Sequence, residues 1–561
     1  MRNILACAIA TLSIAASPSV FAQGKKVQKP NQSSQKAQYF SRPRLVVGMV
    51  VDQMSWEYLY RFNSRFGQSG FRRLLDEGFN CDNARINYLP SVTAIGHSTV
   101  YTGSVPSLHG IAGNNFYDNG KPMYCTEDKS VQTVGAENGK DGQMSPRNLR
   151  ATTITDELRI ATNFTSRVVG VALKDRGAIL PAGHAANAAY WFDDKSGNFI
   201  SSTYYMDKLP QWVNEFNSKR LPEQYLAGGW QPLYPLNTYT ESVADQNKYE
   251  LPWGDVPATL PLDTKALSQK HGVGVIRSTP MGNELTLDMA KAAIEGESLG
   301  MRKDSTDFLA ISLSSTDYVG HRYGTFSVEL EDTYLRLDRQ LASFFSYLDS
   351  KYGKDGYVFF ITADHAAGHN IQFLADKHLP GDKWRVDETK KLVDSVSRSI
   401  SGQNVTLLKD VMNYQIFFNE QRIDSLGLDR DKLYNAVVSA VSKQEGVAYA
   451  VRGDKVNPTT LPTEIAMRIT NGYNRTRSGA IFVVTLPGYM SAGSKPVLGT
   501  NHAVWSPYDT HIPLIFMGHN VPKGHLYREV YMTDIAATLA FLLKTQLPSA
   551  CIGKPITEML K

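Results

Sequence analysis

The sequence predicts an α/β protein with a mostly parallel central sheet flanked by helices, carrying a cap-like insertion and a second inserted subdomain. Three observations support this fold class. Near-continuous apolar runs of strand length recur along the chain, which is typical of strands buried on both faces of a parallel sheet. Helical patterns separate these runs, as in βαβ units. A polar or charged residue directly follows each of several runs.

The N-terminus has the features of a secretory signal. Arg2 provides a positive start, Ile4 to Ile14 is apolar, and Val20-Phe21-Ala22 resembles a cleavage site. We therefore predict a signal peptide over residues 1–22 and a polar, flexible leader over 23–42. The apolar stretch is too short for a permanent membrane span. We expect export to the periplasm, with release from the cell as the alternative.

Composition narrows the possible partners. The 561 residues are 42% hydrophobic, enough for a sizeable core in two to four domain-sized units. A net charge of +5 is too small to indicate nucleic acid as a partner. Three cysteines remain after signal removal, so at most one intramolecular disulfide can form. We expect it between Cys81 and Cys125, which flank the segment containing Thr93.

The first part of the core spans residues 43–184. Leu45 to Val51 is an apolar run that ends at Asp52, and Val168 to Leu173 is a second run that ends at Lys174-Asp175-Arg176. Between them, Pro90 and Ser91 predict a loop and a helix start, with Thr93 in the first turn. The backbone N–H groups of such a turn favour an anion.

Residues 185–300 are rich in Trp, Tyr, Pro and Asn, which predicts an irregular cap over the site. The core resumes over 301–379. There the apolar run Phe308 to Leu313 leads to Asp317 and His321, and Tyr357 to Ile361 leads to Asp364-His365. A helical stripe over 330–348 separates these two predicted strands.

Residues 380–495 predict a second inserted subdomain with its own secondary structure. The predicted helices are Leu392 to Ile400 and Leu433 to Val441, and the predicted strands are Val411 to Phe418 and Ala480 to Leu486. The third part of the core, 496–561, contains His502, a strand over 512–516 and a helix over 534–543.

The polar residues that follow the strands should meet at one edge, because ligands of open α/β sheets bind beyond the carboxyl ends of the strands. The candidate metal ligands are Asp52, Asp317, His321, Asp364, His365 and His502. Carboxylates and imidazoles suit Zn²⁺. Six ligands exceed one tetrahedral site, so the sequence predicts two adjacent Zn²⁺ ions per chain.

Thr93 is the candidate nucleophile for a phosphate or sulfate ester, and Asn114, Lys174 and Arg176 are candidate donors to its oxygens. Taken singly, these residues have simpler explanations. A threonine at a helix start is usually a cap, and Lys174-Asp175-Arg176 alone would be a solvated charge run. The other histidines that we considered are expected to be packed rather than ligands: His97, His109, His184, His369 and His511.

The motifs together resemble the alkaline phosphatase superfamily, most closely its PafA-type periplasmic alkaline phosphatases with a threonine nucleophile. The matching segments are Val50-Val51-Asp52-Gln53-Met54, Pro90-Ser91-Val92-Thr93, Gly110-Ile111-Ala112-Gly113-Asn114, Lys174-Asp175-Arg176, Ser315-Thr316-Asp317-Tyr318-Val319-Gly320-His321, Thr362-Ala363-Asp364-His365 and Gly499-Thr500-Asn501-His502. The resemblance implies an alkaline-phosphatase-like fold. It also implies one zinc on Asp317, His321 and His502, and another on Asp52, Asp364, His365 and Thr93.

The resemblance further implies a covalent phosphothreonine at Thr93 and phosphate contacts from Asn114, Lys174 and Arg176. Two extra cations favour a dianionic monoester, so we expect a broad-specificity hydrolase of small-molecule phosphate monoesters that scavenges phosphate. We also expect the mature chain to be a monomer. A phosphodiesterase, nucleotide pyrophosphatase or phosphonate hydrolase on the same site is the alternative. A non-catalytic exported binding module is disfavoured by the intact Thr93, and a sulfatase by the sequence Thr93-Ala94-Ile95-Gly96-His97.

Overall fold

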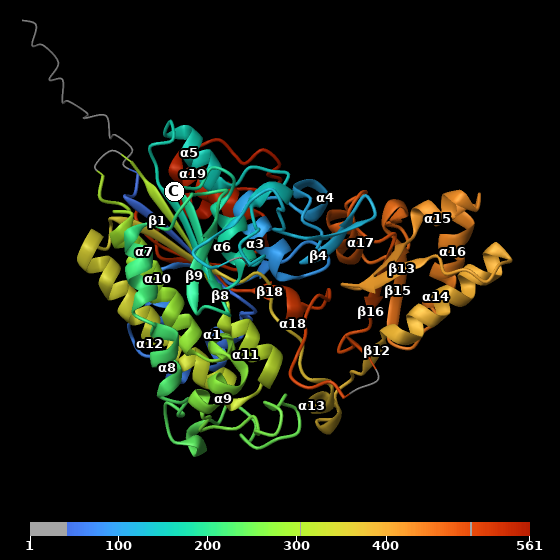
Figure 1. Cartoon of the computed structure of the whole chain (residues 1–561), viewed down its shortest axis with the longest axis horizontal. Helices are drawn as coiled ribbons and strands as arrows, with labels where there is room; N and C mark the ends of the chain where they lie inside the picture. Colours follow the sequence, from blue (N-terminus) through green and yellow to red (C-terminus); the bar gives the residue numbers. More distant parts are fainter. Residues whose placement is uncertain (1–41, 138, 303–304, 494–495, 561) are drawn as a thin grey trace, which may run out of the picture. The chain divides into compact units, whose positions relative to one another are not determined.

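Strand β1 (Leu45–Val51) lies in the interior of the main sheet and is completely buried, as its apolar sequence predicts. The structure is a computed structural model that describes residues 42–137, 139–302, 305–493 and 496–560 (Figure 1). The predicted signal peptide (1–22) and leader (23–42) lie outside the described residues, apart from Arg42.

Ten strands from the described residues form the main sheet. Their order is β20 (Gly524–Leu526), β2 (Phe79–Cys81), β19 (Leu514–Gly518), β11 (Tyr357–Thr362), β1, β10 (Asp307–Leu313), β7 (Val168–Ala172), β8 (Ala188–Asp193), β9 (Asn198–Ser202) and β6 (Thr133–Val134). The five central strands from β11 to β8 are parallel, which confirms the predicted fold class. Antiparallel pairs at both edges make the whole sheet mixed.

Strand β19 runs antiparallel to β11, with Leu514 opposite Thr362. The chain reaches β19 from the edge of the sheet at which β11 ends, since Ala366 N donates to Asp509 O at 2.9 Å. A strand that starts beside the end of its neighbour must run in the opposite direction. The apolar run over 512–516 predicts this strand, but its direction depends on that connection.

Two groups of helices cover the sheet (Figure 1). One group contains α3 (Thr93–Thr102), α5 (Ile154–Ala161), α6 (Asp175–Ala182) and α19 (Asp534–Leu543). The other contains α7 (Gln211–Ser218), α8 (Leu221–Ala227), α10 (Met281–Gly296), α11 (Ser315–Tyr323) and α12 (Val328–Tyr352). The predicted helices over 330–348 and 534–543 are confirmed as α12 and α19.

The range 185–300, predicted to be a cap, contributes to the central layer at both ends. Strands β8 and β9 belong to the main sheet, and α10 packs against β10 and β7. Between α8 and α9 (Thr264–His271), residues 228–263 are mostly irregular. The buried side chains of Trp230 and Trp253 lie in this segment, so its aromatic content serves packing.

The range 380–495 contains a four-stranded antiparallel sheet in the order β13 (Leu408–Met412), β14 (Gln415–Phe418), β16 (Ile481–Thr485) and β15 (Val447–Arg452). Its helices include α14 (Val386–Ser401), α15 (Glu420–Ser425), α16 (Arg430–Val441) and α17 (Thr463–Gly472). The single strand predicted over Val411 to Phe418 is a hairpin instead. Asn413 and Tyr414 both have positive φ, which gives the tight turn between β13 and β14.

The cysteines and the helices test two further predictions, the disulfide and the lack of a membrane span. Cys81, Cys125 and Cys551 are all free thiols, so the predicted Cys81–Cys125 disulfide is wrong. Cys81 ends β2 and Cys125 follows β5 (Lys121–Tyr124), and both side chains are buried in the core. None of the described helices combines the length and apolarity that a membrane crossing requires.

Candidate metal and phosphate site

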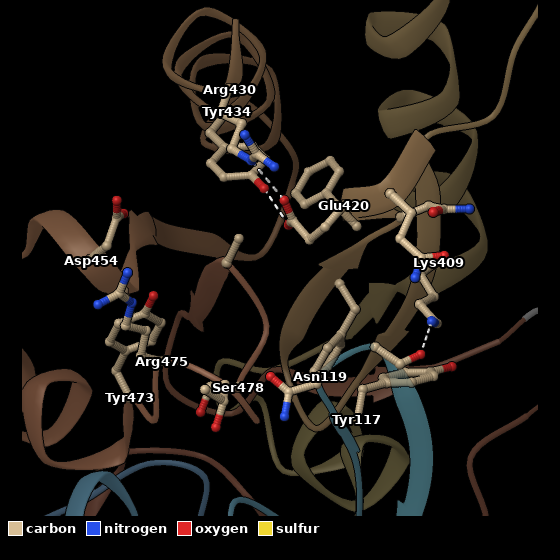
Figure 2. A pocket seen from close by; sticks show the side chains of 18 residues that line it. Tyr117, Asn119, Lys409, Glu420, Arg430, Tyr434, Asp454, Tyr473, Arg475 and Ser478 are labelled. Atoms are coloured by element: carbon tan, nitrogen blue, oxygen red, sulfur yellow. Dashed lines mark hydrogen bonds and ion pairs between the residues drawn. The ribbon is translucent and has the colours of Figure 1, made fainter. Parts of the chain in front are cut away.

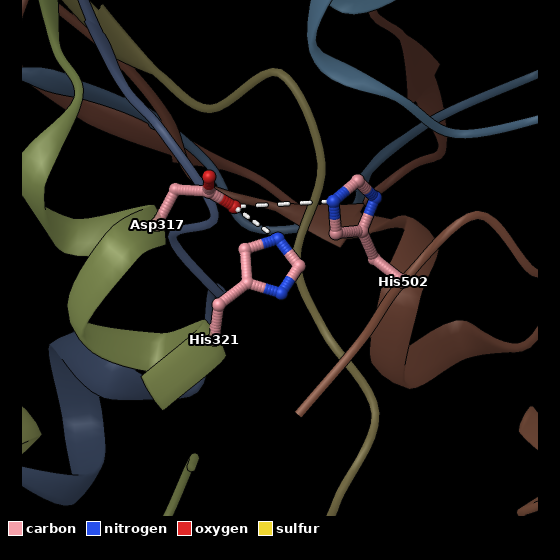
Figure 3. A group of neighbouring side chains, drawn as sticks. All are labelled: Asp317, His321 and His502. Carbon is pink, nitrogen blue, oxygen red and sulfur yellow. Dashed lines mark ion pairs between the residues drawn. The ribbon is translucent and has the colours of Figure 1, made fainter. Parts of the chain in front are cut away.

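The structure brings the six candidate ligands together at the carboxyl ends of the central strands, in two groups of three. Asp52, Asp364 and His365 form one group, and Asp317, His321 and His502 form the other (Figure 3). Within each group the ligand atoms lie within 4.8 Å of one another. His365 and His502 also stack, with ring centroids 3.6 Å apart, which joins the two groups.

The three histidines are oriented in the same way. In each ring Nδ1 lies within hydrogen-bond distance of a backbone carbonyl: His321 with Thr500 (2.9 Å), His365 with Ala366 (3.0 Å) and His502 with Ser91 (2.7 Å). A proton on Nδ1 that is donated to the carbonyl leaves the Nε2 lone pair free. Each Nε2 faces a carboxylate of its own group. This arrangement is typical of metal-binding histidines.

The carboxylates of the first group have unsatisfied oxygens. Asp52 Oδ1 and Asp364 Oδ2 are buried and accept no hydrogen bond from the described residues. Burial, and then the charge of Asp52, raise the pKa of Asp364 well above its usual value. Such crowding is costly without a counter-charge. Buried oxygens without partners, beside imidazole Nε2 atoms, fit a Zn²⁺-type cation.

Lys174 lies between the two groups. Its Nζ donates to Asp52 Oδ2 and to Asp317 Oδ2, at 2.6 Å each. Burial lowers the pKa of Lys174, but the two carboxylates outweigh this effect and the net shift is upward. Lys174 is therefore an ammonium that shares its charge with candidate ligands of both groups, a contact that its position after β7 alone does not predict.

Thr93 is the first residue of α3, which confirms the predicted helix start. Its Oγ1 lies 3.4 Å from His365 Nε2. One turn later, Gly96 packs against Asp364: a Cβ at this position would lie 2.4 Å from Asp364 O. The missing side chain lets α3 approach the end of β11, and this places the hydroxyl beside the first ligand group.

The other predicted phosphate contacts surround this helix start. Asn114 Oδ1 accepts a hydrogen bond from Ala94 N at 2.9 Å, which orients the amide next to Thr93. Arg176 lies in the first turn of α6, and its Nη1 donates to Tyr124 Oη at 3.0 Å. Tyr124 Oη in turn donates to Asp175 Oδ1 at 2.8 Å, so the tyrosine fixes the guanidinium.

Sequence reasoning missed two residues of this region. Gln53 donates from Nε2 to Asp317 Oδ1 (2.6 Å) and from its backbone N to Asp364 Oδ1 (3.1 Å), so it supports both groups. Asp509 forms a third cluster with His365 and His502. Of these two, only Gln53 carried a sequence signal, since it directly follows Asp52. His97, which the sequence predicts to be packed, lies buried under the site, with Nδ1 2.9 Å from Thr93 O and 3.4 Å from Asp364 Oδ2.

The family model described as type I phosphodiesterase / nucleotide pyrophosphatase matches residues 46–507. The chain belongs to the type I phosphodiesterase/nucleotide pyrophosphatase family. This membership confirms the predicted relation to the alkaline phosphatase superfamily.

Members of the family resemble this chain over nearly its whole length. Alkaline phosphatase PafA of Elizabethkingia meningoseptica is 48% identical over 94% of this chain and 96% of its own. Alkaline phosphatase PhoV of Synechococcus elongatus is 49% identical over 96% and 97%. A Myroides odoratus protein named calcium-transporting ATPase is 49% identical over 93% and 95%.

The fold of this chain agrees with the fold of PafA. The crystal structure of wild-type PafA superimposes with a TM-score of 0.89 at 48% identity, and the match covers 93% of this chain and 99% of that one. A second structure is of a PafA variant substituted at a threonine, an asparagine, a lysine and an arginine, and it also has a TM-score of 0.89. The predicted PafA-type resemblance is thus confirmed.

Proposed function

We propose that this protein is an exported phosphatase that hydrolyses small phosphate monoesters through a covalent phosphothreonine at Thr93. The observation that carries the proposal is the position of Thr93 Oγ1, at the start of α3 and 3.4 Å from His365 Nε2. Two relatives named alkaline phosphatase, each at least 48% identical over most of the chain, support the same reaction.

We propose that the two ligand groups hold two Zn²⁺ ions, with Thr93 completing the group of Asp52, Asp364 and His365. The buried oxygens without partners and the three Nε2 atoms that face carboxylates support this assignment. When bound, zinc supplies positive charge that lowers the pKa of a coordinated hydroxyl and stabilises attacking and leaving oxygens. Gln53 and the backbone carbonyls at the histidine Nδ1 atoms hold the ligands in place.

In the first step Thr93 Oγ1 gives up its hydroxyl proton to solvent water and attacks phosphorus, and the bond from phosphorus to the alcohol oxygen breaks. The departing alkoxide takes a proton from water. In the second step water attacks phosphorus, the bond to Thr93 breaks, and a proton returns to Oγ1 as phosphate leaves. The N-terminus of α3 directs its backbone N–H groups and positive dipole end toward this position, which favours the added negative charge.

Asn114, Lys174 and Arg176 are the proposed donors to the non-bridging oxygens. The Asn114 amide is oriented by Ala94 N, and the Arg176 guanidinium by Tyr124. Fixed donors stabilise charge in the transition state without having to reorganise. Two cations beside the site favour the dianion of a monoester over the monoanion of a diester.

The family description also names phosphodiesterases, so a diester hydrolase on the same site is the second candidate. We would compare p-nitrophenyl phosphate with methyl p-nitrophenyl phosphate on residues 23–561 and determine zinc on the same sample. A higher kcat/KM for the monoester, with about two zinc ions per chain, supports the proposal. A preference for the diester would leave the fold and Thr93 in place but overturn the roles of Lys174 and Arg176.

Other elements of the proposal come from the sequence. We propose that residues 1–22 direct export to the periplasm and that the mature chain is a monomer that scavenges phosphate. We propose a three-part core, 43–184, 301–379 and 496–561, with insertions at 185–300 and 380–495, of which the first also supplies β8, β9 and α10 to the central layer. N-terminal sequencing and the mass in solution of the exported protein test the first two statements.

A further inference from the structure

A cavity of about 770 Å³ lies against the hairpin formed by β4 (Asn115–Asp118) and β5. Its size is in the range of small-molecule sites. Three partly exposed methionines, Met123, Met144 and Met412, line it together with Phe116, Tyr117 and Tyr124. We call it the methionine cavity. No candidate metal ligand lines it.

One end of the methionine cavity lies beside the proposed phosphate contacts. Asn115 and Tyr124 pair across the base of the hairpin, and both line the cavity. Asn115 directly follows Asn114, which binds Ala94 N, and Tyr124 Oη accepts from Arg176 Nη1 at 3.0 Å. The cavity thus adjoins the proposed phosphate contacts through two of its lining residues, Asn115 and Tyr124.

Much of the wall suits an apolar group, and Asn115, Lys129, Lys140 and Gln143 supply polar parts of the lining. Methionine side chains are flexible and polarisable, and they fill irregular space around rings of different shape. The two carboxylates that line the cavity are already paired, Glu127 with Lys129 at 3.2 Å and Asp410 with Lys390 at 3.0 Å. Neither acid therefore presents an uncompensated negative charge to a ligand.

The hairpin wall is held in place at its far end. There Lys409 Nζ donates to Gly120 O in the turn, next to a second cavity that Tyr117 and Asn119 also line (Figure 2). Asn119 N donates to Thr476 O at 3.1 Å. Arg477 Nη2 lies 2.8 Å from Asp118 Oδ2. These contacts connect the hairpin to the range 380–495.

We propose that the methionine cavity receives the alcohol part of the substrate, and that the preferred substrates are phosphate esters of aromatic or other bulky apolar alcohols. The inference rests on the proposed monoesterase function and specifies its substrate class. Met123, Met144 and Met412 are the specificity-determining residues.

The test compares kcat/KM for 1-naphthyl phosphate with kcat/KM for glycerol 3-phosphate, a small polar ester. The ratio of these two values is the selectivity. Replacing Met123 and Met144 together by Gln should lower the selectivity roughly tenfold, because polar amides replace apolar contacts with the ring. Met412→Trp, which fills the cavity, should lower it as well. Met301→Gln is the matched control, since Met301 is 53% exposed and does not line the cavity.

A selectivity that stays unchanged in both cavity variants overturns the inference, even if both activities fall together. A selectivity loss confined to the cavity variants, with Met301→Gln like the parent, supports it. Failure of the parent protein with full metal content to hydrolyse either ester would instead overturn the proposed function. The two failures are therefore distinguishable in one set of assays.

Discussion

At the scale of single residues, the proposed chemistry depends on one hydroxyl. Thr93 occupies the first helical position of α3. A threonine near a helix start often has no role other than capping the helix. Thr93 makes no capping bond there, because the N-cap residue is Val92 and no side-chain cap is present. Its Oγ1 instead faces His365 Nε2. The hydroxyl is thus available for reaction, since it does not cap the helix.

Thr93→Ala should lower kcat for p-nitrophenyl phosphate by roughly a thousandfold or more, since the attacking atom is lost. Thr93→Ser keeps a hydroxyl and should retain much of the rate. Zinc content and melting temperature are measured on the same samples to confirm that both variants are folded and loaded. An alanine variant as fast as the parent would mean that water, not Thr93, attacks phosphorus.

Gln53 is a positioning residue that bonds Asp317 through its side chain and Asp364 through its backbone N. Gln53→Ala should weaken metal retention by roughly 10- to 100-fold, because a residue that orients metal ligands is removed. The measurement is the chelator concentration that removes half of the zinc. Gln211→Ala, at an exposed position in α7, is the control. If both variants retain zinc equally well, Gln53 contributes only to packing.

At the scale of elements, the residues that end strands were predictable, but the contacts between elements were not. Asp52 and Asp364 end apolar runs, and parallel pairing alone brings them to one edge. The approach of α3 to Asp364 depends on tertiary packing at Gly96, which no periodicity indicates. The wrong Cys81–Cys125 prediction has the same origin, because closeness in sequence to Thr93 says nothing about where two buried side chains point.

Gly96→Ala tests the packing of α3. The added Cβ would meet Asp364 O at 2.4 Å and Asp364 Cβ at 2.5 Å, so helix and ligand must separate. We expect a loss of about 1–3 kcal/mol in the free energy of unfolding, together with weaker zinc retention. Urea unfolding measures the first quantity. Gly228→Ala is the control, since its nearest neighbour is Tyr225 O at 3.7 Å. If both variants match the parent, α3 does not need this close approach.

At the scale of the whole molecule, buried acids outside the site limit alkaline stability. Burial raises the pKa of Glu250 to about 8, and its Oε2 accepts no hydrogen bond from the described residues. The nearby Glu329 is fully buried with both oxygens unsatisfied, and burial followed by the charge of Glu250 raises its pKa too. Both carboxyls stay protonated in the folded chain at a pH at which the unfolded chain has released the protons.

Proton binding decides how the free energy of unfolding changes with pH. Between about pH 4.5 and 8 the folded state binds more protons than the unfolded state, so the free energy of unfolding falls as pH rises. Glu250→Gln removes this cost, and the gain in melting temperature over the parent should grow from pH 5 to pH 8. The exposed Glu445→Gln is the control. A gain that is constant with pH would contradict a raised pKa at Glu250.

The residues of the site are spread over most of the sequence, which affects when the site can form during biosynthesis. Asp52 emerges from the ribosome early, whereas His502 comes close to the C-terminal end and binds back to Ser91 O next to Thr93. Asn471 likewise binds Asn87 O across most of the chain. A polypeptide that stops before residue 502 contains Thr93 but lacks His502. We therefore expect activity only when synthesis is almost complete.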